Sequence, residues 1–221
     1  MIYLDNGATS FHKPPAVYKA VLEAMHTCAN PGRGGYGAAR MASDVVYGCR
    51  EQAGILFDCL PEQVVLTGNC THGLNLAIHS CVKPGSRVVI SGFEHNAVTR
   101  PLAALGARVA VASAPLFHRE ELVRAFERQI TPQTKAVVCN HVSNVFGFIQ
   151  PIEEIAAICR EKGVPLIVDA SQAVGHTEIS LKEGPCDVFC APGHKGLFGI
   201  QGCGFAVFKD NKRGNCLVEG G

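Results

Sequence analysis

Apolar, β-branched runs alternate with helix-like patterns along most of the 221 residues. Runs of strand type cover 64–67, 87–91, 108–113, 136–142, 165–170, 186–190 and 203–208. Helical periodicity predicts helices at 14–28, 40–58, 71–82, 96–105, 119–128 and 151–162. Near-continuous apolar strands that alternate with helices are typical of a mostly parallel sheet covered on both faces. We therefore expect a three-layer α/β fold with a seven-stranded sheet.

The last expected strand, 203–208, follows its predecessor after a short glycine-rich loop. A parallel connection needs a crossover of a dozen or more residues, usually a helix, and this loop is too short for one. The strand is therefore predicted to run antiparallel to the others. No repeat, low-complexity segment or interdomain linker interrupts the chain, so 1–221 is predicted to be one large domain.

Composition excludes several classes of function. A net charge of +1 gives no electrostatic field for nucleic acid or an anionic membrane. No apolar run approaches the roughly 20 residues that a bilayer span needs, and the N-terminus lacks the features of a secretory signal. The eleven cysteines include no C-x-x-C pair, and residues such as Cys139 and Cys190 lie inside apolar runs. We therefore expect buried free thiols rather than a metal site, and a reducing cytoplasm.

Lys195 lies in a glycine-rich turn, Ala191–Gly199, between two strand-like runs. Asp169 emerges from the apolar run 166–168, so its carboxylate needs a partner to stay charged. A lysine that can form a Schiff base and an acid at a strand end are the minimum set for pyridoxal phosphate chemistry, because the acid can pair with the pyridine nitrogen. A helix N-cap is the alternative role for Asp169.

Polar residues also follow two earlier strands. The segment 68–73 contains Cys70 and Thr71 and leads into a helix, which makes an anion cradle suited to phosphate. An ordinary N-cap by Thr71 explains the same pattern. His95 follows the strand 87–91, where an imidazole could stack on a planar ring or move a proton. A solvent-facing loop histidine is the alternative.

Three further residues complete the set. Asn144 follows the strand 136–142, where its amide could bond a phenolate oxygen or simply serve a turn. Gln172 stands three residues after Asp169 and could reach the same oxygen. His194, beside Lys195, could add a phosphate donor. Ligands of open α/β sheets collect beyond the carboxyl ends of the strands, which is where all these residues are expected.

The order of these motifs resembles the class V aminotransferases, a family of fold-type I pyridoxal phosphate enzymes. The likeness is strongest to cysteine desulfurases and selenocysteine lyases, and it covers essentially the whole chain. The motifs that carry it are Tyr3-Leu4-Asp5-Asn6-Gly7-Ala8-Thr9-Ser10, the Thr71 turn, Glu94-His95-Asn96, His141-Val142-Ser143-Asn144, Val168-Asp169-Ala170-Ser171-Gln172 and Gly193-His194-Lys195.

The resemblance implies catalytic roles for Lys195 and His95. Lys195 would bind the cofactor as a Schiff base and move the Cα proton of the substrate. His95 would stack on the pyridine ring and take part in proton transfer, while Asp169 would pair with the ring nitrogen. In the family, cysteine is converted to alanine, and a separate enzyme cysteine takes the sulfur as a persulfide.

The resemblance also implies the remaining cofactor contacts. Asn144 and Gln172 would touch the 3′ oxygen of the ring. Thr71, His194 and backbone amides near Cys70 would hold the phosphate. Relatives are homodimers that pass sulfur to acceptor proteins for iron–sulfur or thio-cofactor synthesis.

Two departures from the pattern are visible. Many desulfurases have a serine two positions before the histidine that precedes the lysine, and here that position is Pro192. Relatives also continue beyond the glycine-rich stretch that begins at Gly220–Gly221, into a second domain of roughly 100–150 residues. That domain carries the persulfide-forming cysteine and a substrate-binding arginine, and none of the eleven cysteines matches that position.

We therefore expect a truncated chain that holds the cofactor machinery without the sulfur acceptor. Two alternatives stay open. One is another class V activity, such as an aminotransferase, a selenocysteine lyase, an epimerase or a kynureninase-like hydrolase. The other is an inactive fragment or scaffold.

Overall fold

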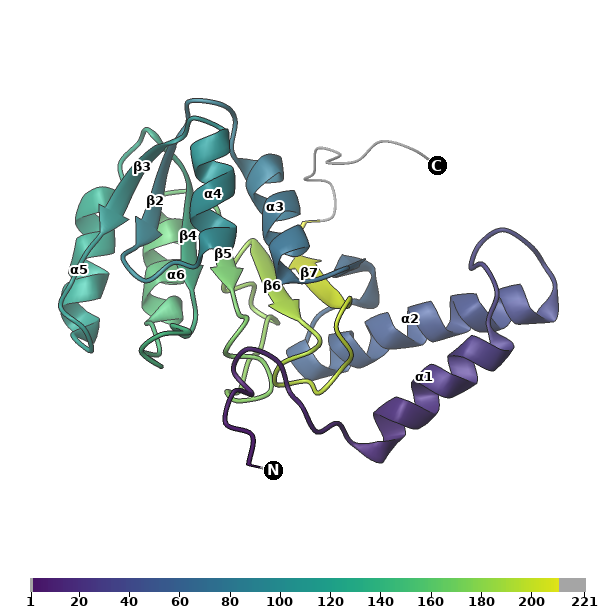
Figure 1. Cartoon of the computed structure of the whole chain (residues 1–221). Helices are drawn as coiled ribbons and strands as arrows, with labels where there is room; N and C mark the ends of the chain where they lie inside the picture. The colour runs from purple at the N-terminus through teal and green to yellow at the C-terminus, as the bar shows by residue number, and fades with distance from the viewer. Residues whose placement is uncertain (1, 211–221) are drawn as a thin grey trace.

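The computed structural model describes residues 2–210, and Gly220–Gly221 lies outside them. A seven-stranded sheet is flanked by helices on both faces (Figure 1). The strands are β1 (Val64–Thr67), β2 (Arg87–Ser91), β3 (Arg108–Ala112), β4 (Thr134–Asn140), β5 (Leu166–Asp169), β6 (Val188–Pro192) and β7 (Gly204–Phe208). The helices are α1 (Pro15–Thr27), α2 (Gly37–Phe57), α3 (Cys70–Cys81), α4 (Asn96–Ala104), α5 (Arg119–Gln129) and α6 (Ile152–Glu161), with a 3₁₀ turn at Pro61–Gln63.

The strand order is β1-β7-β6-β5-β4-β2-β3. Strands β2 to β6 pair in parallel, whereas β7 pairs antiparallel with both β1 and β6. The short connection from β6 to β7 leaves no room for a crossover helix, so the chain turns back beside β6. The predicted seven-stranded α/β sheet with one antiparallel strand is therefore confirmed.

Strand β4 shows why the central strands are apolar throughout. Val137 and Cys139 join the hydrophobic cluster under α5 and α6, while Ala136 and Val138 join the cluster under α3 and α4. Successive side chains of a strand point to opposite faces, so a strand covered on both sides has no polar face. The sheet thus has two cores, one on each face.

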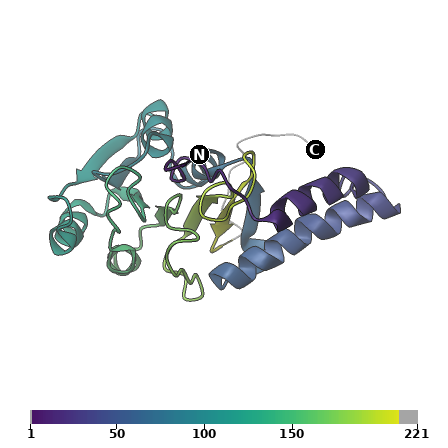
Figure 2. The ribbon, with the colours of Figure 1, turned by 60° about the horizontal axis from the view of Figure 1, so that its bottom comes forward.

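The helices α1 and α2 form a hairpin that extends away from the sheet (Figures 1 and 2). No residue of α1 is buried. The C-terminal end of α2 reaches the core through Phe57, which is 2% exposed and packs on the rings of Phe189 and Phe205. The hairpin is therefore anchored mainly at one end.

Three elements have boundaries that differ from the prediction by more than one residue. Helix α2 begins at Gly37 rather than at residue 40, because Ala38 and Ala39 continue the helix into the glycine-rich segment. Strand β4 ends at Asn140, two residues early, because the chain then bends toward the isolated Val142–Ile149 bridge. Strand β6 runs on to Pro192, which pairs with Gly204 of β7.

The described cysteines are all free thiols, and Cys139 and Cys190 are buried as expected. Burial raises the pKa of both thiols well above the usual value. Between residues 2 and 210, no three side chains of His, Cys, Asp or Glu are grouped to hold a metal ion. None of the helices in that range is long and apolar enough to cross a membrane.

Candidate functional site

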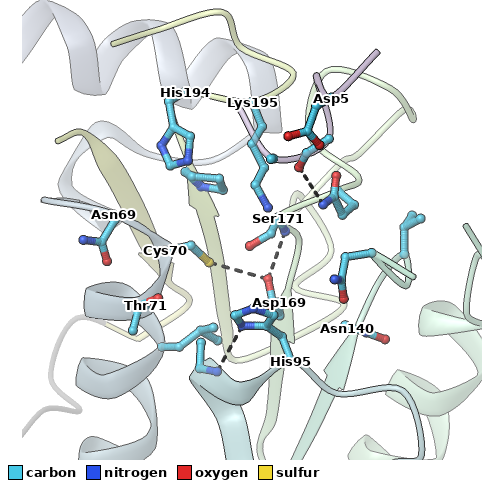
Figure 3. Close-up of a pocket in the computed structure, with 18 of the residues that line it drawn as sticks. Asp5, Asn69, Cys70, Thr71, His95, Asn140, Asp169, Ser171, His194 and Lys195 are labelled. Atoms are coloured by element: carbon cyan, nitrogen blue, oxygen red, sulfur yellow. Dashed lines mark hydrogen bonds between the residues drawn. The ribbon is translucent and has the colours of Figure 1, made fainter. Parts of the chain in front are cut away.

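A pocket of about 570 Å³ lies at the carboxyl ends of β4, β5 and β6, between the N-termini of α3 and α4. Each of these strands contributes its last residue to the lining: Asn140, Asp169 and Pro192. All eight residues predicted from the sequence line this one pocket (Figure 3): Cys70, Thr71, His95, Asn144, Asp169, Gln172, His194 and Lys195. The structure thus brings together positions spread over more than half of the chain.

The turn that carries Lys195 is held by its own backbone. The amide of Gly193 donates to the carbonyl of Cys203 at 2.9 Å, and the amide of Gly199 donates back to the carbonyl of Gly193 at 2.7 Å. The amide of Phe198 closes the turn on the carbonyl of Lys195 at 2.9 Å. A Cβ added to Gly193 would lie 2.5 Å from the Cys203 sulfur, so the Cys203 side chain would have to move to admit it.

Two glycines join this turn to the segment that follows Asp169. A Cβ on Gly196 would run into the carbonyl oxygen of Val174, and a Cβ on Gly175 would run into the carbonyl oxygen of Gly196. Gly175 also has a φ of +82°, which L side chains rarely adopt. The two backbones touch without side chains between them, which keeps Lys195 near Asp169.

An N-terminal strap, residues 3–10, forms one wall of the pocket. The carbonyl oxygen of His194 accepts three hydrogen bonds from it: from the Ser10 amide at 2.9 Å, the Ser10 hydroxyl at 3.0 Å and the Thr9 hydroxyl at 3.2 Å. On the other side of the strap, the backbone carbonyl of Gly7 accepts a hydrogen bond from the side-chain amide of Gln172 at 3.0 Å. The strap therefore fixes the turn that carries Lys195, and Asp5 and Gly7 line the pocket from it.

Asp169 is 4% exposed, and its Oδ1 accepts from the Ser171 amide at 2.9 Å and from the Cys70 thiol at 3.5 Å. Within residues 2–210 it forms no ion pair. The Ser171 bond closes a turn rather than starting a helix, so the N-cap alternative for Asp169 is wrong. A buried carboxylate without a cation calls for a positively charged partner in the pocket.

The N-terminus of α3 points at the pocket. Asn69 caps the helix, because its side chain accepts from the His72 amide at 2.8 Å, so the N-cap alternative for Thr71 is wrong. The Thr71 hydroxyl has no protein partner in the part of the chain that the structure describes. A hydroxyl without a hydrogen-bond partner beside a helix N-terminus can bind an anion such as phosphate.

His194 offers a second anion contact. Its Nδ1 is buried and has no hydrogen-bond partner among residues 2–210. Burial, reinforced by the charges of Lys195 and Lys13, lowers the pKa of His194. The imidazole is therefore neutral at neutral pH and can donate a single N–H.

His95 is the N-cap of α4, with Nδ1 accepting from the Ala97 amide at 3.1 Å. In the neutral ring the proton therefore lies on Nε2, which leaves that nitrogen to exchange a proton. His95 is exposed, but it lines the pocket and is not simply a solvent-facing loop histidine. Asn144 is also exposed and belongs to a turn, so its predicted turn role and its place in the pocket coexist.

Sequence reasoning missed several pocket residues, of which Asn140 is the most connected. Its side-chain amide donates to the Phe93 carbonyl at 2.6 Å, and its backbone amide donates to Glu94 Oε1 at 2.9 Å. Glu94 also accepts from the Ser91 hydroxyl at 2.5 Å. Burial raises the pKa of Glu94 to about 8. A polar side chain inside the apolar run predicted for 136–142 was the signal that could have found Asn140.

Three other polar lining residues were missed, and they lie near predicted ones along the chain or across the pocket: Asp5, Asn69 and Ser171. Together the lining offers a lysine amine, a buried carboxylate without a cation, and donors grouped at a helix N-terminus. These features match the aldehyde, the ring nitrogen and the phosphate of pyridoxal phosphate respectively. The residues present therefore fit this cofactor.

Comparison with known proteins agrees with this pattern. The sequence model of "Aminotransferase class-V" matches residues 2–221. A probable cysteine desulfurase of Methanothermobacter thermautotrophicus is 29% identical over 227 residues, an alignment that covers 100% of this chain and 56% of the relative. One of Xylella fastidiosa is 32% identical over 214 residues, covering 92% of this chain and 50% of the relative.

The fold has close counterparts among solved structures. The apo structure of cysteine desulfurase from Thermococcus onnurineus NA1 superimposes with a TM-score of 0.90 at 28% identity, covering 100% of this chain and 57% of that one. The chain thus spans little more than half the length of these relatives.

Proposed function

The chain belongs to the class V aminotransferase family, and on that premise we propose that it is the cofactor-binding part of a cysteine desulfurase-like enzyme. Such an enzyme binds pyridoxal phosphate, removes sulfur from L-cysteine and leaves alanine. The observation that carries the proposal is the pocket that collects Lys195, Asp169 and His95, with Asp169 buried and unpaired by any cation of residues 2–210.

Each part of the cofactor has residues to hold it. Lys195 is the amine that attaches its aldehyde, and Asp169 holds a proton at its ring nitrogen. Thr71, His194 and the amides at the start of α3 near Cys70 hold its phosphate. When bound, pyridoxal phosphate supplies an electron sink that stabilises negative charge at the Cα of an amino acid.

Proton transfer falls to two side chains. The Nζ of Lys195 would take the Cα proton of the amino acid. His95 exchanges a proton through Nε2, because its Nδ1 is engaged by the Ala97 amide. His95 would also pack against the ring, while Asn144 and Gln172 would bind its 3′ oxygen.

Several finer features belong to the same proposal. The substrate is L-cysteine, with L-selenocysteine as the close analogue. The names of the relatives support a desulfurase, whereas Pro192 removes one phosphate donor seen in many of them. No cysteine of this chain is assigned as the persulfide-forming nucleophile.

The cellular context is also part of the proposal. We place the protein in the cytoplasm as a homodimer, passing sulfur to an acceptor protein for iron–sulfur or thio-cofactor synthesis. The exposed apolar side chains of the α1–α2 hairpin, such as Leu22, Met25 and Val45, support an interface there.

The test begins with the cofactor. The chain mixed with pyridoxal phosphate should develop an absorbance band near the visible edge, and borohydride should then fix the cofactor on Lys195, as read by peptide mass. Absence of both would overturn the cofactor assignment. Given L-cysteine, with dithiothreitol as sulfur acceptor and reductant, the cofactor-loaded full-length protein should release sulfide and alanine in equal amounts. Keto acid formed without sulfide would instead indicate another class V activity.

A further inference from the structure

The two carboxylate oxygens of Asp169 have different surroundings. Oδ1 accepts from the Ser171 amide at 2.9 Å and from the Cys70 thiol at 3.5 Å. Oδ2 has no hydrogen-bond partner among residues 2–210, and Asp169 lines the pocket. One oxygen is therefore held by the protein, and the other is left for whatever the pocket binds (Figure 3).

Cys70 is the first residue of α3, 6% exposed, and belongs to the hydrophobic cluster under α3 and α4. Burial, reinforced by the charge of Asp169 and by Cys190, raises the pKa of the Cys70 thiol well above its usual value. The group therefore stays protonated and can donate its S–H to the carboxylate. Its place is fixed by the Asn69 cap, which sets where α3 begins.

Donation to a carboxylate favours its charged form. A charged Asp169 leaves the shared proton on the ring nitrogen of the cofactor, whereas a carboxylate short of donors draws that proton toward itself. The thiol also restricts rotation of the carboxyl group, because Ser171 and Cys70 bind the same oxygen from different elements.

We propose that Cys70 is a positioning residue that acts through Asp169, holding Oδ1 so that a charged Oδ2 faces the ring nitrogen of the cofactor. The inference rests on the proposed function, since it concerns how the chain orients its partner for pyridoxal phosphate. This role of the Cys70 thiol is separate from sulfur transfer and from metal binding.

The experiment compares Cys70→Ala, Cys70→Ser and wild type, each loaded with pyridoxal phosphate labelled with ¹⁵N in the ring. Cys70→Ala removes the donor, so the ¹⁵N shift should move toward that of a neutral pyridine and the cofactor should bind about fivefold more weakly. Cys70→Ser keeps a donor and should stay close to wild type in both measurements. Cys190→Ala is the matched control, because it removes a neighbouring buried thiol that forms no hydrogen bond to Asp169.

The outcomes separate a positioning role from packing. An unchanged ¹⁵N shift in Cys70→Ala overturns the inference, as does a shift in Cys190→Ala of the same size. If Cys70→Ala fails to fold, Cys70→Val fills the volume without a donor and takes its place in the comparison. A wild-type protein that binds no cofactor would overturn the proposed function itself. A wild-type protein that binds it, with variants of the same ¹⁵N shift and affinity, would overturn only the role of Cys70.

Discussion

The Ser10 hydroxyl donates a hydrogen bond to the backbone carbonyl of His194, 3.0 Å away, at the residue directly before Lys195. Ser10 is 3% exposed, and the Thr9 hydroxyl donates to the same oxygen. The start of the chain therefore holds the turn that presents the lysine. This bond is a contact between segments far apart in sequence.

Replacing both hydroxyls, in Thr9→Val with Ser10→Ala, should loosen that turn. Each lost hydrogen bond is worth about 1 kcal/mol, so we expect attachment of pyridoxal phosphate to weaken by up to about 30-fold. The measurement is the absorbance of the bound cofactor against its concentration. Thr27→Ala, which removes a hydroxyl bonded to the Glu23 carbonyl and near the Cys28 sulfur, is the control. Equal cofactor affinity in the double variant and the control would count against the role of the strap.

Gly196→Ala should separate the Lys195 turn from the segment after Asp169. An added Cβ would overlap the carbonyl oxygen of Val174, so backbone must shift, and we expect a loss of about 2 kcal/mol or more in the free energy of unfolding. Cofactor binding should fall with it. Gly48→Ala in α2 meets no atom within 4 Å and should instead stabilise the helix slightly. Denaturant unfolding of both variants tests the pair, and a neutral Gly196→Ala would refute the close approach.

Glu94 should make the protein less stable as the pH rises. Burial raises its folded pKa from 4.5 to about 8, so the folded state keeps a proton that the unfolded chain loses. The stabilisation is complete below pH 4.5 and is lost progressively up to about pH 8. A glutamine at this position cannot ionise, so Glu94→Gln should remove this loss of stability. At pH 8 its free energy of unfolding should exceed that of wild type by on the order of 4 kcal/mol, and it should unfold at a higher temperature.

The matched control for that experiment is Glu127→Gln, an exposed glutamate of α5. Its stability should follow wild type at every pH. If Glu94→Gln and wild type lose stability in parallel between pH 5 and pH 8, Glu94 is ionised in the folded protein and the prediction is wrong.

Lys195→Ala should abolish the absorbance band and the borohydride-fixed adduct, because Lys195 is the one lysine of residues 2–210 that lines the pocket. Folding should be nearly unchanged, since the side chain forms no hydrogen bond within residues 2–210. Lys135→Ala, on an exposed position of β4, should keep both signals. A fixed adduct that persists in Lys195→Ala would assign the attachment to a different lysine.

Asp169→Asn should keep some cofactor but lose most turnover, by roughly 100-fold, since a neutral amide cannot hold the ring nitrogen protonated. Cofactor content and sulfide release are measured on the same sample. Turnover that matches wild type at equal cofactor content would remove Asp169 from this role.

The sheet and most of the site could be predicted because they follow from local sequence. Strand β5 is apolar up to Asp169, so burial on both faces and the polar strand end are both visible in one short run. The direction of β7 followed from the length of the loop before it. Parallel strands then bring their carboxyl ends to one edge of the sheet, which gathers Thr71, His95 and Lys195.

Contacts that depend on three-dimensional packing could not be read in this way. Asn69 and Thr71 are both capable N-caps, and the extended φ of −175° at Asn69 decides between them. Glu94 looks like a surface residue in Glu94-His95-Asn96, yet its carboxyl group is buried beside Asn140. The strap is polar and short, and nothing in it signals that Ser10 reaches His194.

The position of β1 has a consequence for the order of assembly during synthesis. Within residues 2–210, β1 pairs only with β7, the last strand of the sheet along the chain, through partners such as Val64 and Val207. Helix α3 begins at Cys70, shortly after β1 ends at Thr67, so the pairing of β1 with β7 completes the sheet beside the start of that helix. Closing so long a loop is slow and comes late in folding. Residues 204–208 must therefore be synthesised before β1 can join the sheet.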